Sequence, residues 1–89
     1  MFTTLIFHIH LVRCIFYDGD VKGGREEQLG LTSSTDSEEK CAALVAKERP
    51  YATGATWQEQ PYKCWAEFGN NIESADNYRT CLFPTSGNQ

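Results

Sequence analysis

The architecture of this chain is governed by residues 35–68, which read TDSEEKCAALVAKERPYATGATWQEQPYKCWAEF. The first part of the stretch predicts a helix over residues 36–48. Thr35 is a good N-cap, and Glu38 at the third helical position completes a capping box. Pro50 prevents the helix from continuing, because proline lacks a backbone N–H and disfavours helical angles in the residue before it. The expected apolar stripe of the helix is Cys41, Leu44 and Val45, with Ala42 and Ala43 beside it.

Strands are expected on both sides of this helix, because branched and aromatic residues are concentrated there. The predicted strands are Val12–Tyr17, Tyr51–Trp57, Tyr62–Phe68 and Tyr78–Phe83. Turn signals at 18–20 and 23–24 end the first strand, and residues 25–34 fit a loop or a short edge strand. The connection Gly69–Asn77 has the composition of a turn. The simplest assembly is an α+β fold in which a single helix packs on a small antiparallel sheet.

The length and charge of the chain restrict its organisation and its partners. With 89 residues there is room for one domain, which we assign to residues 12–84, followed by a C-terminal tail at 85–89. The net charge is −4 and the eight basic residues form no cluster, so binding to nucleic acid or to an anionic membrane is not expected. The sequence does not predict the oligomeric state.

Residues 1–11 allow two interpretations. Phe7, Ile9 and Leu11 alternate with His8 and His10, which is typical of a strand extension. The alternative, less favoured, is a remnant of a secretory leader, because the segment lacks a positively charged start and a small-residue cleavage pattern. It is too short and too polar to cross a membrane as a helix, so membrane insertion is not expected.

The four cysteines, at positions 14, 41, 64 and 81, are spread singly along the chain. No Cys-x-x-Cys pair occurs, which suits two long-range disulfides better than a metal knuckle. Because a chain this short buries a limited core, covalent links are expected to contribute much of its stability in an oxidising compartment. Four cysteines allow three pairings, and spacing alone does not choose among them.

Three segments, Cys41–Val45, Ala52–Trp57 and Tyr62–Phe68, resemble the PAN/apple domain family. That family carries a helix that begins with a cysteine, a strand that ends in a Thr/Ser–aromatic pair, and a strand with a central cysteine. In this chain the three features are Cys41, Thr56-Trp57 and Cys64. The resemblance covers roughly residues 12–84.

The resemblance implies an apple-like fold in which Cys41 pairs with Cys64 and Cys14 pairs with Cys81. Typical members have a further helix cysteine bonded to the following strand, at positions that correspond here to Val45 and Ala52. Both of those cysteines are missing together, so none is left unpaired. The chain therefore resembles a divergent, two-disulfide form of the family.

Metal and catalytic motifs are weak in this sequence, and we expect no cofactor, no metal and no catalytic residue. The spacing of His8 and His10 matches no closed zinc pattern. The run that begins at Asp18 starts like a calcium loop, but Lys22 and Leu29 stand where ligands belong. No Ser-His-Asp arrangement or activated thiol is evident.

Aromatic residues are the best candidates for ligand binding. If Cys64 points towards the helix, period-two alternation sends Ala66 and Phe68 the same way and places Trp65 and Glu67 on the other face. That face is either covered by the N-terminal strands or open to a ligand. By the same alternation, Tyr78 shares this face with Trp65. A second candidate surface is formed by Trp57 and Tyr62, which flank the polar hairpin tip Gln58–Gln60. The predicted ligand-binding residues are Trp57, Tyr62, Trp65, Glu67 and Tyr78.

These observations lead to three functional hypotheses. The first is a secreted, extracellular recognition module of apple-like type, which binds a protein or a carbohydrate without catalysis. By resemblance, such modules serve adhesion or targeting within larger secreted proteins. The alternative is a stand-alone secreted effector, a protease inhibitor or a defence-type peptide, to which small size and disulfides also point. A reduced, intracellular metal protein is a third and weaker interpretation of the cysteines.

Overall fold

A computed structural model describes residues 14–30 and 35–84 of the chain. The N-terminal segment with its two histidines and the tail at 85–89 lie outside these residues. The elements follow one another as β1 (Phe16–Asp18), β2 (Asp20–Val21), β3 (Glu26–Leu29), α2 (Glu38–Glu48), β4 (Gly54–Gln58), β5 (Lys63–Glu67), β6 (Ile72–Glu73) and β7 (Arg79–Leu82). Within the described part of the chain, no helix has the length and apolar character needed to cross a membrane.

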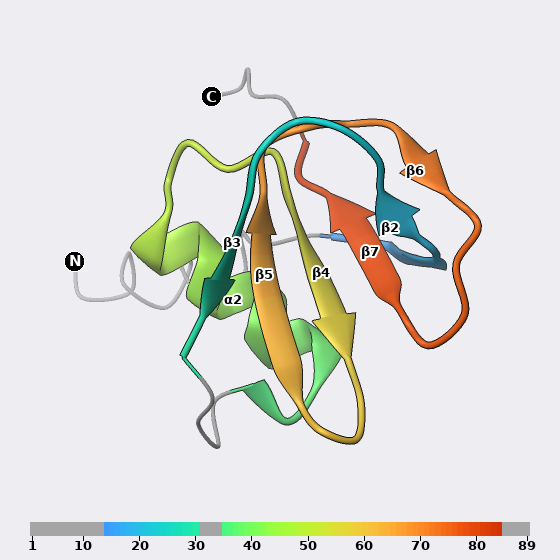
Figure 1. Cartoon of the computed structure of the whole chain (residues 1–89). Coiled ribbons are helices and arrows are strands. Elements are labelled where there is room, and N and C mark those ends of the chain that lie inside the picture. Colours follow the sequence, from blue (N-terminus) through green and yellow to red (C-terminus); the bar gives the residue numbers. More distant parts are fainter. Residues whose placement is uncertain (1–13, 31–34, 85–89) are drawn as a thin grey trace, which may run out of the picture.

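Five strands form one antiparallel sheet in the order β1-β7-β4-β5-β3, with β4 in the centre. The helix α2 packs across one face of this sheet, against β4 and β5 (Figure 1). The remaining strands, β2 and β6, pair as a two-stranded ribbon beside β7 (Figure 1). The predicted α+β fold, with a single helix on a small antiparallel sheet, is confirmed.

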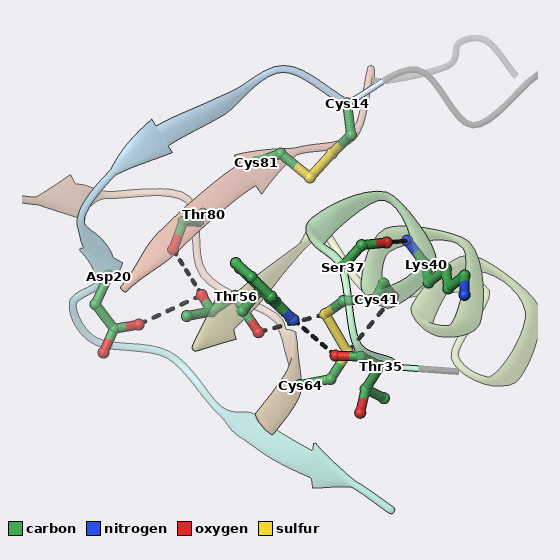
Figure 2. The surroundings of a disulfide bond; sticks show 11 residues. Cys14, Asp20, Thr35, Ser37, Lys40, Cys41, Thr56, Cys64, Thr80 and Cys81 are labelled. Atoms are coloured by element: carbon green, nitrogen blue, oxygen red, sulfur yellow. Dashed lines mark hydrogen bonds between the residues drawn. A yellow bond between two sulfur atoms is a disulfide. The ribbon is translucent and has the colours of Figure 1, made fainter. Parts of the chain in front are cut away.

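Two disulfides connect parts of the chain that are distant in sequence (Figure 2). Cys41 of α2 is bonded to Cys64 of β5, with 5.6 Å between their Cα atoms. Cys14, just before β1, is bonded to Cys81 of β7, with 5.3 Å between their Cα atoms. The pairing implied by the family resemblance is therefore confirmed, and no cysteine is free.

The core lies between α2 and the sheet and is built mainly from small side chains. Ala55, Ala66, Cys64 and Cys81 point from the strands towards the helix, and all are fully buried. From the helix, Cys41, Ala42 and Val45 are buried, whereas Leu44 is half-buried and Ala43 is exposed. Small residues on the sheet allow the helix to pack closely, so the covalent bond between Cys41 and Cys64 fits inside the core.

The start of the helix differs from the sequence prediction. Ser37, not Thr35, is the N-cap, because its hydroxyl accepts a hydrogen bond from the backbone N–H of Lys40 at 3.1 Å. Thr35 is fully buried, and its carbonyl oxygen accepts a hydrogen bond from the indole of Trp57. The expected capping box does not form, because the Glu38 carboxylate binds Arg79 instead.

The strand predictions are confirmed with shifted boundaries, but two short strands, β2 and β6, were not predicted. In the described residues, the first strand begins at Phe16, and the segment after residue 24 contains the edge strand β3. The strand expected from Tyr51 begins only at Gly54, and Tyr51 is 90% exposed. The two segments read as turns, at 18–20 and 69–77, each contribute a strand to the β2–β6 ribbon. A two-residue strand carries too little alternation to be recognised in sequence.

Candidate functional site

A hollow of about 350 Å³ lies at one end of the five-stranded sheet. It forms where β1 and β4 end and β7 begins, beside the hairpin that connects β4 to β5. We call it the sheet-end hollow. It is lined by Asp18, Trp57, Glu59, Gln60, Asn77, Tyr78 and Arg79.

Trp57, the main aromatic residue of the sheet-end hollow, is held in place by two contacts. Its indole Nε1 donates a hydrogen bond to the backbone carbonyl of Thr35 at 2.7 Å. The ring of Tyr62 stacks on it, with 6.1 Å between the ring centroids and 20° between the ring planes. These contacts connect the hairpin to the segment that precedes α2, so the Trp57 ring is held in one orientation before any ligand arrives.

Tyr78 forms a second aromatic part of the lining and is supported by Trp65. The two rings meet edge to face, with 5.7 Å between their centroids and 61° between their planes. This geometry is favourable because the positive edge of one ring meets the negative face of the other. Both side chains are half-buried. The ring of Tyr78 is therefore packed against Trp65 of β5.

Arg79 organises the charged side of the sheet-end hollow. Its guanidinium donates hydrogen bonds to both carboxylate oxygens of Glu38, at 3.0 and 3.3 Å, and to Asp18 at 2.9 Å. The carboxylate of Glu38 first and that of Asp18 second raise the pKa of Arg79. Because this cation and the Asp18 carboxylate are paired with each other, and no ion pair of the described residues involves Glu59, the charged lining group available to a ligand is the exposed carboxylate of Glu59.

The structure brings together some of the predicted ligand-binding residues and separates another. Trp57 and Tyr78 line the sheet-end hollow, whereas Tyr62 and Trp65 contact these two rings from outside it. Glu67 was predicted as a ligand-binding residue on the same face as Trp65. That face is confirmed by the register, but Glu67 is only 1% exposed, so it cannot contribute to an open aromatic surface. The ribbon strand β2 lies over this part of the sheet, as the contact of Asp20 with Thr56 shows (Figure 2).

Three lining residues were not predicted from the sequence: Asp18, Asn77 and Arg79. Asp18 and Arg79 meet because they are paired in the register of β1 and β7, which are far apart along the chain. The hairpin tip with Glu59 and Gln60 was recognised as a candidate surface. The sequence predicts Trp57 and Tyr78 on two separate surfaces. In the structure, both residues line the sheet-end hollow.

Comparisons of the chain with family models, with curated proteins and with solved structures find no match. The character of the sheet-end hollow is therefore argued from its own residues. These residues supply aromatic rings, amides, carboxylates and one guanidinium, and include no Ser, Cys or His. Such a lining provides groups for recognition.

Proposed function

We propose that this chain is an extracellular recognition module, similar to PAN/apple domains, that binds a carbohydrate in the sheet-end hollow. The observation that carries the proposal is the combination of Trp57 and Tyr78 with the amides of Gln60 and Asn77 around one hollow. Aromatic rings provide flat apolar surfaces against which the C–H face of a sugar packs. Amide and carboxylate groups at the rim bind the hydroxyls of a sugar, which are both donors and acceptors.

The shape of the site favours a carbohydrate over a folded protein partner. The sheet-end hollow is concave, and its volume of about 350 Å³ lies at the lower end of the usual range for small-ligand sites, roughly 300–1,000 Å³. A stable protein interface buries about 800 Å² on each partner, which requires a broad surface with an apolar centre. Trp57 and Tyr78 are half-buried within a small hollow instead. A single sugar unit, at the end of a glycan chain or on a branch, matches the volume of this hollow.

The extracellular location is supported by the disulfides. Both bonds connect distant segments, and all four cysteines are used in them. Disulfides of this kind persist in oxidising compartments and are reduced in the cytosol. The helix-to-strand bond between Cys41 and Cys64 also lies where the PAN/apple resemblance implies it. These points support an apple-like module rather than a reduced intracellular metal protein.

The test is glycan binding by the oxidised full chain on an array, followed by titration calorimetry with the best ligand. We expect Tyr78→Ala and Glu59→Ala to weaken binding about tenfold or more, as loss of a central contact does. Gln60 and Asn77 are poor choices for substitution, because their backbones have positive φ angles of 59° and 72°.

The matched control is Tyr51→Ala, which removes an equally large aromatic ring from a site that is 90% exposed and outside the sheet-end hollow. It should leave glycan affinity unchanged. Binding of no glycan, or equal losses in all three variants, would remove the carbohydrate hypothesis. A protease-inhibition assay on the same material tests the alternative of a secreted effector.

A further inference from the structure

The carboxylate of Glu67 is buried without a partner. The residue is 1% exposed, and neither of its side-chain oxygens has a hydrogen-bond partner within the described part of the protein. Removing an ionised carboxylate from water without compensation is costly, so buried carboxylates are normally paired with donors or bound to a metal ion. A carboxyl group in this position is therefore either protonated or neutralised by a bound cation.

Two further carboxylates, those of Glu26 and Asp20, lie close to the carboxylate of Glu67. Glu26 of β3 lies directly opposite Glu67 of β5 in the antiparallel register, and Asp20 comes from β2. Each of the three residues offers one carboxylate oxygen, and these oxygens all lie within 4.8 Å of one another. We call Asp20, Glu26 and Glu67 the acidic cluster. Like charges placed directly opposite each other across two strands destabilise a sheet, so the arrangement is unfavourable by itself.

No cation of the described residues compensates the acidic cluster. The ion pairs found in residues 14–30 and 35–84 engage other carboxylates, and Lys22 is paired with Glu73 at 3.7 Å. The guanidinium of Arg25 lies over the ring of Phe68, 4.1 Å from its centroid. The three carboxylates thus meet where no cation of residues 14–30 and 35–84 forms an ion pair with them.

We propose that Asp20, Glu26 and Glu67 bind a calcium ion on the face of the sheet opposite α2. The ligands are all hard oxygens, which Ca²⁺ and Mg²⁺ prefer over softer metals. The three oxygens lie within 4.8 Å of one another, close enough for one cation to contact all of them. Ca²⁺ accepts several carboxylates in a flexible geometry, whereas Mg²⁺ demands near-octahedral geometry and is usually bound through one or two carboxylates and several waters. Three carboxylates from three separate strands therefore favour calcium.

The position of the cluster supports this assignment. Asp20 is oriented by hydrogen bonds from the backbone N–H of Val21 at 2.8 Å and from the Thr56 hydroxyl at 3.4 Å (Figure 2). Glu26 is exposed on an edge strand, which gives an ion and its remaining water ligands access from solvent. The sequence predicted no metal, since a contiguous calcium loop from Asp18 lacks ligands. In the structure Asp18 binds Arg79, and the oxygens come from three separate strands.

The test is thermal unfolding of the oxidised full chain, treated with EDTA and dialysed, in CaCl₂, in MgCl₂ or in NaCl of matched ionic strength. Extracellular modules bind calcium with dissociation constants of about 10⁻⁴–10⁻³ M. At about 10 mM CaCl₂ we therefore expect the Tm to rise by roughly 6–20 °C, with a smaller rise in MgCl₂ and none in NaCl. Titration calorimetry with CaCl₂ should show one saturable site.

Glu67→Gln and Glu26→Gln should each abolish the calcium response. The second variant lies at an exposed position and is the safer one for folding. The matched control is Glu73→Gln, which removes an exposed carboxylate outside the acidic cluster and should keep the response. A wild-type Tm that does not change with CaCl₂ would overturn the proposal, and so would an equal response to MgCl₂ or loss of the response in Glu73→Gln. The acidic cluster is distinct from the sheet-end hollow, so glycan binding is judged independently.

Discussion

Gly54 shows how one residue determines the spacing of the central strands. It begins β4 and pairs with Glu67 of β5 on one side and with Leu82 of β7 on the other. A Cβ added at this position would overlap the carbonyl oxygen of Cys81 and would lie 3.1 Å from the Cα of Leu82. These neighbours are backbone atoms of an adjacent strand, so they cannot move aside without disturbing the sheet.

We expect Gly54→Ala to lower the free energy of unfolding by about 1–3 kcal/mol, because overpacking forces the backbone to shift. The measurement is urea denaturation of the oxidised protein, followed by circular dichroism. Gly30→Ala is the matched control, since a Cβ at Gly30 meets no atom within 4 Å. It should change stability by less than about 0.5 kcal/mol. Equal stability of both variants would show that β4 and β7 are less closely packed than described.

At the scale of elements, the start of α2 joins the helix to the sheet and to the sheet-end hollow. Three successive residues, Thr35, Asp36 and Ser37, all have good N-cap character. Ser37 takes this position, while the buried Thr35 holds Trp57 through its carbonyl. Glu38 then binds Arg79, so the first helical turn also fixes one side of the hollow. The cap is therefore chosen by contacts with the sheet, not by local preference.

We expect Ser37→Ala to lower the free energy of unfolding by about 1 kcal/mol, because the backbone N–H of Lys40 loses its acceptor. Ser37→Asp should retain stability, since aspartate is an equally good N-cap. Asp36→Ala serves as a comparison: it removes only an exposed ion pair with Lys40, a contact of about 0.5 kcal/mol or less. Chemical denaturation of the three variants measures these differences. A larger loss in Asp36→Ala than in Ser37→Ala would contradict the assigned cap.

For the whole molecule, the two disulfides constrain loops of different length. Cys14 and Cys81 are 67 residues apart in sequence, and Cys41 and Cys64 are 23 residues apart. In the chain-entropy model, the longer loop contributes about 4.4 kcal/mol and the shorter about 3.4 kcal/mol by restricting the unfolded state. Small domains have a total stability of only about 5–15 kcal/mol. The covalent links are therefore a large part of what keeps this chain folded.

We expect the double variant Cys14→Ala/Cys81→Ala to lose about 4 kcal/mol of unfolding free energy, the entropy contribution of its loop. Cys41→Ala/Cys64→Ala should lose about 3 kcal/mol from the same effect, and more from packing, because both sulfurs lie in the core. Urea denaturation compares the two variants. Non-reducing peptide mapping confirms that the remaining bond is intact. A variant as stable as the wild type would show that its disulfide does not constrain the unfolded chain.

Local patterns in the sequence predicted much of this architecture. Capping residues and Pro50 placed the helix within two residues of its observed bounds. Alternation around Cys64 placed Ala66 towards the helix and Trp65 on the other face. Such inferences succeed because helical and strand periodicities depend on neighbours along the chain. The disulfide pairing came from the family resemblance, and the structure confirms it.

Contacts between segments that are distant in the sequence cannot be predicted from such local periodicities. Asp18 meets Arg79 across 61 residues, and the acidic cluster draws its oxygens from three separate strands. These meetings depend on strand register, which is set when the helix, the sheet and both disulfides pack together. Periodicity placed the face of Glu67 correctly, yet its burial follows from strands that fold over it. The element types are thus encoded locally, whereas the sheet-end hollow and the acidic cluster arise from the assembled fold.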